Sequence, residues 1–173
     1  VKALEVAMAV ENGADEVDIV LNVGRMLTGE YNEAANEVEV IRTEMDEDVV
    51  LKVIIESGAL KTPELIRKAS LLSMLAGADF VKTSTGKIDV AATPEAAVVM
   101  CQAIKDYFDK TGRKVGFKAA GGVRSAEDAA LYYTIVEEIL GKEWLTTDLF
   151  RIGASSAANN LISAIEGKEV KYF

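Results

Sequence analysis

The feature that most constrains the fold is a regular alternation of short β-branched runs with longer helix-forming stretches. The β-branched runs predict five strands, at Glu16–Asn22, Val49–Ile55, Phe80–Thr85, Val115–Ala119 and Leu149–Gly153. Their midpoints, near residues 18, 52, 82, 118 and 152, are 34, 30, 36 and 34 residues apart. Each interval accommodates one strand and one helix, which is typical of parallel βα units.

The stretches between the strands contain helix formers, with apolar residues recurring every three to four positions. They predict helices at Lys2–Asn12, Tyr31–Glu44, Pro63–Ala76, Thr93–Lys110, Ala126–Leu140 and Ser156–Glu166. Two helix starts carry a threonine N-cap followed by a first-turn proline, at Thr62 and at Thr93. We expect residues 1–173 to form one α/β domain.

Two architectures are built from such units, an open doubly wound sheet and a (β/α)8 TIM barrel. Charged residues recur on one face of four successive strands, at Asp18, Lys52, Lys82 and Lys118. Helices cover both faces of an open sheet, whereas a barrel lumen can hold a polar layer, so the barrel is favoured. A complete TIM barrel needs eight strands and typically ~250 residues. We therefore expect the C-terminal five βα units of a TIM barrel, without the three N-terminal units.

The composition excludes several kinds of function. With 19 basic and 28 acidic residues the net charge is −9, which disfavours nucleic acid and anionic membranes as partners. No apolar run is long enough to span a bilayer, and no leader segment is recognisable at the start. The single cysteine, Cys101, is expected to be a packing residue in a cytoplasmic, reducing environment.

The chain contains no histidine. A Ser-His-Asp or Cys-His site needs an imidazole, and catalytic zinc is usually held by at least one. The chemistry must therefore come from lysine, carboxylate, hydroxyl or backbone groups, and we expect neither a metal nor a cofactor.

Two lysines occupy matching places near the ends of neighbouring strands. Lys82 precedes the segment Thr83–Lys87, and Lys118 precedes a glycine turn. Ammonium groups on strands ~4.8 Å apart repel each other, which favours loss of a proton from one of them. Because a neutral lysine can attack a carbonyl carbon, the pair indicates Schiff-base catalysis. The alternative is a lysine that merely extends from a strand end into solvent.

Three glycine turns follow strand ends and predict an anion site. Their candidate binding residues are Gly86, Lys87, Gly121, Gly122, Val123, Arg124, Gly153, Ser155 and Ser156. Glycine lets backbone N–H groups approach a phosphate, and a helix begins directly after the third turn. Together with Lys52, Lys82 and Lys118, the basic residues of these turns would attract an anionic substrate.

Asp18 is the available carboxylate on the same face as these lysines. It could be a counter-ion for Lys52 or Lys118. It could also position the water that carries protons during catalysis. The two roles are compatible, so both stay open at this point.

Five segments resemble, in order, the deoxyribose-phosphate aldolase family. They are EVDIV at 16–20, LKVIIESG at 51–58, FVKTSTGK at 80–87, GFK at 116–118 with GGVR at 121–124, and RIGASS at 151–156. The resemblance implies a class I aldolase on a TIM barrel. Such an enzyme, a lyase of deoxyribonucleotide catabolism, cleaves 2-deoxy-D-ribose 5-phosphate reversibly to D-glyceraldehyde 3-phosphate and acetaldehyde.

The resemblance also implies roles for individual residues. Lys82 matches the Schiff-base nucleophile, Lys118 the second lysine that favours its neutral form, and Asp18 the aspartate of the proton relay. The three glycine turns match the phosphate-binding positions. The family's first three strands, which carry further active-site residues, have no counterpart in these motifs.

Other functions stay compatible with the sequence. One is another class I aldolase, acting on a ketose phosphate, and a second is a non-catalytic phosphosugar-binding barrel. A third is an inactive fragment that associates through open strand edges. The expected partner is a small phosphorylated sugar, with neither nucleic acid nor membrane, and a homodimer is compatible with this interpretation.

Overall fold

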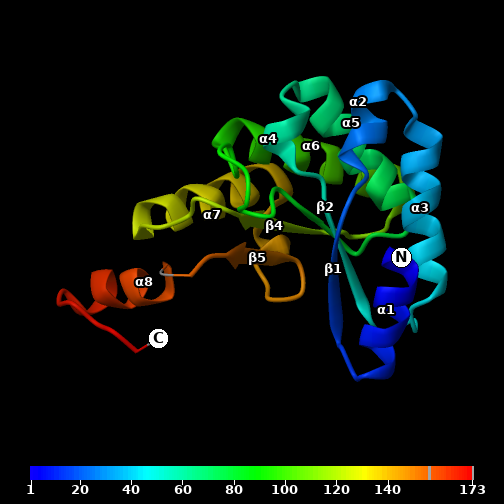
Figure 1. Cartoon of the computed structure of the whole chain (residues 1–173). Helices are drawn as coiled ribbons and strands as arrows, with labels where there is room; N and C mark the ends of the chain where they lie inside the picture. Colours follow the sequence, from blue (N-terminus) through cyan, green and yellow to red (C-terminus); the bar gives the residue numbers. More distant parts are fainter. Residues whose placement is uncertain (156, 173) are drawn as a thin grey trace.

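A computed structural model of the chain describes residues 1–155 and 157–172. Its centre is a five-stranded sheet formed by β1 (Glu16–Val20), β2 (Val50–Ile54), β3 (Phe80–Lys82), β4 (Gly116–Ala120) and β5 (Phe150–Gly153). The strands lie side by side in chain order, and every neighbouring pair is parallel. The predicted parallel βα units are therefore confirmed (Figure 1).

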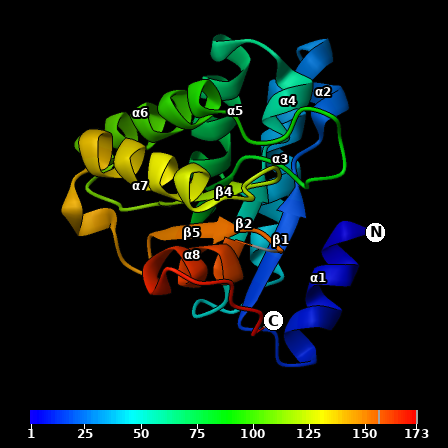
Figure 2. The ribbon, with the colours of Figure 1, turned by 90° about the vertical axis from the view of Figure 1, so that its left-hand side faces the viewer.

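The helices are α1 (Lys2–Glu11), α2 (Val23–Thr28), α3 (Tyr31–Thr43), α4 (Ser57–Leu60), α5 (Pro63–Leu75), α6 (Pro94–Thr111), α7 (Ala126–Leu140) and α8 (Ala157–Glu166), with a 3-10 turn, η1 (Lys142–Trp144). Helices α3, α5, α6 and α7 pack in sequence against one face of the sheet. Figure 2 shows α1 beside the β1 edge and α8 beside β5, at the opposite edge. Among the described helices, none is long and apolar enough to cross a membrane.

The strand order explains why one face of the sheet is polar. Right-handed crossovers that always step to the next strand place every connecting helix on the same side. The register aligns Ile19, Val53, Val81 and Phe117 in one buried row that belongs to the hydrophobic core with the helices. The opposite face is free of these helices, as in the lumen of a (β/α)8 barrel. An α/β architecture of TIM-barrel type is thus confirmed over an open, doubly wound sheet.

The predicted elements are confirmed in type and shifted at some ends. Strand β1 ends at Val20, earlier than predicted, because Asn22 turns to cap α2 by accepting a hydrogen bond from the amide of Arg25. Strand β3 ends at Lys82, earlier than predicted, and the side chain of the next residue, Thr83, bonds to the backbone of Ala120 on β4. The sequence analysis missed the short elements α2, α4 and η1.

Local signals at the helix starts are confirmed. Thr62 and Thr93 each accept a hydrogen bond from the amide three residues later, and Pro63 and Pro94 occupy the first turns. Helix α7 begins with a reciprocal capping box between Ser125 and Asp128. The last helix begins at Ala157, and Ser156, its predicted first residue, lies outside the described residues.

Candidate active site

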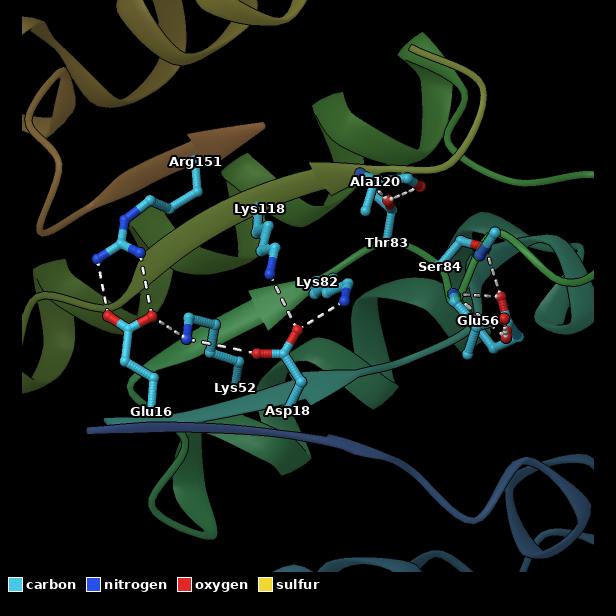
Figure 3. A network of polar contacts seen from close by, with 12 residues as sticks. Glu16, Asp18, Lys52, Glu56, Lys82, Thr83, Ser84, Lys118, Ala120 and Arg151 are labelled. Carbon is cyan, nitrogen blue, oxygen red and sulfur yellow. Dashed lines mark hydrogen bonds and ion pairs between the residues drawn. The ribbon is translucent and has the colours of Figure 1, made fainter. Parts of the chain in front are cut away.

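The register of the strands brings the charged residues of the polar face together. Asp18 is paired with Lys52, Lys82 with Lys118, and Lys118 with Arg151. Side chains of directly paired residues point to the same face, so all five strands contribute to one polar network (Figure 3). The sequence analysis expected Asp18, Lys52, Lys82 and Lys118 on one face, and the register confirms it.

Asp18 lies between the two lysines near the strand ends. Its Oδ2 is 2.6 Å from the Nζ of Lys82 and 2.9 Å from the Nζ of Lys118. Both nitrogens contact the same oxygen, so they lie no farther apart than the sum of these distances, 5.5 Å. Burial alone would raise the pKa of Asp18, but the hydrogen bonds from Lys82 and Lys118 outweigh it and hold this pKa at about 2. Asp18 is therefore an anion at neutral pH.

A second ion-pair cluster lies closer to the start of the strands. Glu16 Oε2 is 2.5 Å from Lys52 Nζ, and the Arg151 guanidinium binds both oxygens of Glu16, at 2.8 and 3.1 Å. The hydrogen bonds from Arg151, then from Lys52, lower the pKa of Glu16 to about 2. The Arg151 guanidinium also lies over the ring of Phe80, 5.5 Å from its centroid. The two clusters are joined through Lys52, whose Nζ is 3.3 Å from Asp18 Oδ1.

Lys52 lies on the same polar face, nearer to the strand starts than Lys82, and its part in anion binding stays a prediction. Lys82 pairs with Ile54, two residues beyond Lys52 on the same face, so Lys52 is displaced about 6.6 Å toward the strand starts relative to Lys82, and it pairs directly with Asp18. Its side chain is 2% exposed and its ammonium contacts two carboxylates. Parity in the sequence identifies the face correctly, whereas the stagger between parallel strands decides which layer a residue reaches.

A pocket of about 460 Å³ opens beside the lysine pair. It is lined by Lys82, Thr85, Gly86, Lys87, Lys118, Ala120, Gly121, Gly122, Val123, Arg124, Gly153, Ala154 and Ser155. Every predicted anion-binding residue of the three turns that the structure describes therefore surrounds one space. Ser156, also predicted to bind the phosphate, lies outside the described residues.

The turns contribute to this pocket in different ways. The amides of Gly86 and Lys87 donate to the hydroxyl oxygens of Ser84 and Thr85, within their own turn. Because these two amides already have acceptors, the Lys87 ammonium is more available to bind an anion than the backbone of this turn is. Gly121 has φ +85°, and a Cβ there would stand 2.5 Å from the side chain of Ala91, so the close packing of these turns needs glycine.

The sequence analysis missed Glu16 and Arg151 as members of the polar network. Both have the alternation signal that identified the other residues, since Glu16 shares the face of Asp18 and Arg151 that of Gly153. The packing role predicted for Cys101 agrees with its complete burial, which raises the pKa of its thiol. Among the described residues, no group of three or more acidic or thiol side chains is arranged to hold a metal ion.

A parallel βα sheet of barrel type, with a lysine pair and a pocket at the strand ends, defines the class of this protein as an α/β-barrel protein. Comparison with known proteins gives the family. The family model described as "DeoC/LacD family aldolase" matches residues 1–143, and the chain belongs to this family.

Individual relatives agree with that result. The deoxyribose-phosphate aldolase of Mus musculus is 49% identical over 157 residues, which is 91% of this chain and 49% of the mouse protein. That of Homo sapiens is 47% identical over 157 residues, with the same coverage. A crystal structure of a Coccidioides immitis protein assigned as a deoxyribose-phosphate aldolase superposes with a TM-score of 0.78 at 31% identity, covering 94% of this chain and 57% of that one. The chain spans about half the length of the curated relatives it matches.

Proposed function

We propose that this chain carries the Schiff-base and phosphate-binding site of an aldolase that cleaves 2-deoxy-D-ribose 5-phosphate reversibly to D-glyceraldehyde 3-phosphate and acetaldehyde. The observation that carries the proposal is the shared carboxylate, with Lys82 and Lys118 both bound to Asp18 Oδ2 beside the pocket. The curated relatives, named deoxyribose-phosphate aldolase, support this choice of substrate over a ketose phosphate.

Lys82 is the nucleophile in this proposal. Its neutral amine adds to the C1 aldehyde carbon of the open-chain sugar, and the resulting carbinolamine loses water to give a protonated Schiff base. Lys118 lies beside Lys82 on the next strand, and the two ammonium groups contact the same oxygen of Asp18. Lys82 and Lys118 line the pocket, so both can reach a bound aldehyde.

The carbon–carbon bond then breaks between C2 and C3. The C3 hydroxyl loses its proton as C3 becomes the aldehyde of glyceraldehyde 3-phosphate, and the bonding electrons pass to the Schiff base, leaving an enamine of acetaldehyde. Protonation at C2 and hydrolysis release acetaldehyde and regenerate Lys82. Asp18, an anion at neutral pH, is suited to hold the water or the lysine that carries these protons.

The phosphate of the substrate is proposed to occupy the part of the pocket between the three turns. Lys87 and Arg124 provide positive charge there, and the Gly121–Gly122 turn and Ser155 provide polar donors. This arrangement would also concentrate an anionic substrate at a chain of net charge −9.

Reductive trapping tests the proposal directly. The purified chain is incubated with acetaldehyde and sodium borohydride, and the modified residue is identified by mass spectrometry of peptides. An ethyl group on Lys82 is expected, because borohydride reduces the Schiff base to a stable secondary amine. An adduct on Lys118 alone would reverse the roles of the two lysines.

The same experiment separates the alternatives. A non-catalytic phosphosugar-binding protein would bind inorganic phosphate without forming an adduct. An aldolase for ketose phosphates would be trapped with a ketose phosphate and not with 2-deoxy-D-ribose 5-phosphate. Cleavage of 2-deoxy-D-ribose 5-phosphate, followed through the glyceraldehyde 3-phosphate produced, distinguishes an active chain from an inactive fragment.

We further propose that the protein acts in the cytoplasm, as a homodimer, on a small phosphorylated sugar. A single buried cysteine is typical of a reducing compartment, and the metabolite is a soluble anion. Light scattering of the purified chain would test the dimer, and fractionation of cells would test the location.

A further inference from the structure

Glu56 occupies an unusual position between β2 and α4. Its backbone is left-handed, with φ 54° and ψ 59°, a conformation that costs energy in any residue other than glycine. Its side chain is a carboxylate, and the residue is only 6% exposed. Burial of a carboxylate is costly unless hydrogen bonds compensate it. Glu56 thus combines a strained backbone with a buried carboxylate beside the candidate active site, which indicates that it has a specific role.

All the hydrogen bonds of this carboxylate that the structure describes come from the turn after β3 (Figure 3). Oε1 accepts from the hydroxyl of Ser84 at 2.7 Å and from the amide of Thr85 at 3.2 Å. Oε2 accepts from the hydroxyl of Thr85 at 2.6 Å. Glu56 therefore ties the end of one strand to the turn that follows the next.

The two hydroxyl groups pass this restraint along the turn. The amide of Gly86 donates to Ser84 Oγ at 2.9 Å, and the amide of Lys87 donates to Thr85 Oγ1 at 3.1 Å. A hydroxyl has one hydrogen and two acceptor lone pairs. Because the Glu56 carboxylate takes both hydrogens, the lone pairs are left to accept from the amides, and the turn is held in one hydrogen-bonding pattern.

The restrained turn forms one wall of the pocket. Thr85, Gly86 and Lys87 all line it, and a Cβ on Gly121 would stand 3.1 Å from the Cα of Gly86, so this turn also packs closely on the next one. Glu56 itself is not part of the pocket lining. The Glu56 carboxylate therefore accepts hydrogen bonds from the turn, and its negative charge does not face an anion in the pocket.

We propose that Glu56 is a positioning residue, which holds the Thr85–Lys87 turn in the shape that receives the phosphate of the substrate. This inference rests on the proposed function, because it assigns the pocket to the phosphate. The proposed positioning role can be distinguished from a general contribution to stability by what the loss of the carboxylate changes. The loss of the carboxylate should weaken the binding of phosphate and leave the lysine site intact.

The test compares the wild-type chain with Glu56→Gln in two assays. Inorganic phosphate is titrated calorimetrically, and the rate of borohydride trapping with acetaldehyde is measured at Lys82. Glutamine has nearly the same shape, but its amide nitrogen is a donor and cannot accept the Thr85 hydroxyl hydrogen. We expect the dissociation constant for phosphate to rise roughly tenfold, as for one lost hydrogen-bonding arrangement. Acetaldehyde carries no phosphate, so the trapping rate should stay at the wild-type value.

Two further variants make the result specific. Glu64→Gln, an exposed glutamate in the first turn of α5, is the matched control and should leave both assays unchanged. Thr85→Val removes the hydroxyl between Glu56 and Lys87 and keeps the branched shape, so it should also weaken phosphate binding. If Glu56→Gln does not fold, Thr85→Val decides the question.

Hydrogen exchange gives an independent measurement. The amides of Gly86 and Lys87 should exchange faster in Glu56→Gln, while those of the β3–β4 ladder keep their protection.

Unchanged phosphate affinity in Glu56→Gln would overturn the proposal, as would equal losses of phosphate binding and trapping. A wild-type chain that binds no phosphate would also overturn it. A wild-type chain that binds phosphate but is not trapped at Lys82 would refute the aldolase and leave the role of Glu56 to be judged from the titration.

Discussion

The polar face of the sheet contains two clusters with the same charges and different surroundings. In the upper cluster, Asp18 lies between Lys82 and Lys118. In the lower cluster, Glu16 lies between Lys52 and Arg151. Each therefore has one carboxylate between two cations, with Lys52 also reaching Asp18, and both carboxyl groups have a pKa of about 2. The positions of the charges alone do not distinguish a site for chemistry from an internal support.

The cations and their access to the pocket make the difference. Arg151 carries a guanidinium, which cannot attack a carbonyl carbon as a lysine amine does, and neither Arg151 nor Lys52 lines the pocket. Lys82 and Lys118 are lysines that line the pocket, with side chains 14% and 19% exposed against 2% for Lys52. The same arrangement of a carboxylate and two cations can thus support the sheet in the lower cluster and line the pocket in the upper one.

The largest effect is expected from a change to the nucleophile. Lys82→Arg should abolish trapping with acetaldehyde and all turnover, because a guanidinium stays protonated and cannot form a carbinolamine. Lys105→Arg, on the exposed surface of α6, is the control and should react like the wild type. Peptide mass spectrometry after borohydride treatment measures the result. An adduct that persists in Lys82→Arg would place the Schiff base on another lysine.

A smaller effect is expected when the shared carboxylate is neutralised. Asp18→Asn should still form the adduct at Lys82, but it should slow the proton-transfer steps by roughly the 10²–10⁴-fold typical of general acid–base groups. Comparison of kcat for 2-deoxy-D-ribose 5-phosphate with the trapping rate separates the two steps. Equal losses in both would mean that Asp18 acts on the formation of the Schiff base itself.

In the lower cluster, a substitution should cost stability and spare the chemistry. Lys52→Met keeps the length of the side chain but leaves part of the Glu16 and Asp18 carboxylates without a partner. The free energy of unfolding measured in urea should therefore fall by about 1–3 kcal/mol. The adduct at Lys82 should still form. If Lys52→Met loses the adduct and keeps its stability, Lys52 belongs to the reacting layer and the comparison fails.

The smallest effect is expected in the dependence of stability on pH. The pKa of Glu16 is lowered from its ordinary value of 4.5 to about 2 by its hydrogen bonds with Arg151 and Lys52. A lowered carboxyl pKa stabilises the fold above the unfolded-state value, and this stabilisation is lost as the pH falls from about 4.5 toward 2. Glu16→Gln should therefore have a lower Tm than the wild type at neutral pH, and the difference should shrink in this window. Thermal unfolding between these pH values measures it, and a constant difference would contradict the assignment.

Much of the fold could be predicted because the signals are local. The alternation in EVDIV and the two Thr-Pro helix starts act within a few residues, and the structure confirms them. The short elements at strand ends were missed because tertiary contacts select them. The sequence predicts Asn22 as the last residue of a strand. In the structure, its side chain caps α2 and also donates to Glu37 on α3.

The candidate site was predictable in part for the same reason. The alternation within each strand identifies the face of Asp18, Lys52, Lys82 and Lys118, because side chains of a strand alternate between its two faces. It gives no information on the stagger between strands, so it could not show that Lys52 lies outside the lining of the pocket. Nor does it show that the strongest contacts of Glu56 are with Ser84 and Thr85, 28 and 29 residues away.

The sequence by itself determined the parallel βα units, the polar face of the sheet and the kinds of functional group available for chemistry, since these follow from local alternation and composition. Only the tertiary structure decided which charges meet. The register and stagger of five strands place two lysines on one oxygen of Asp18, hold Lys52 between Glu16 and Asp18, and bring Arg151 from the last strand to Glu16 on the first. Contacts between residues 64 to 135 positions apart depend on how the strands are aligned, and that alignment is fixed by packing of the whole sheet against its helices.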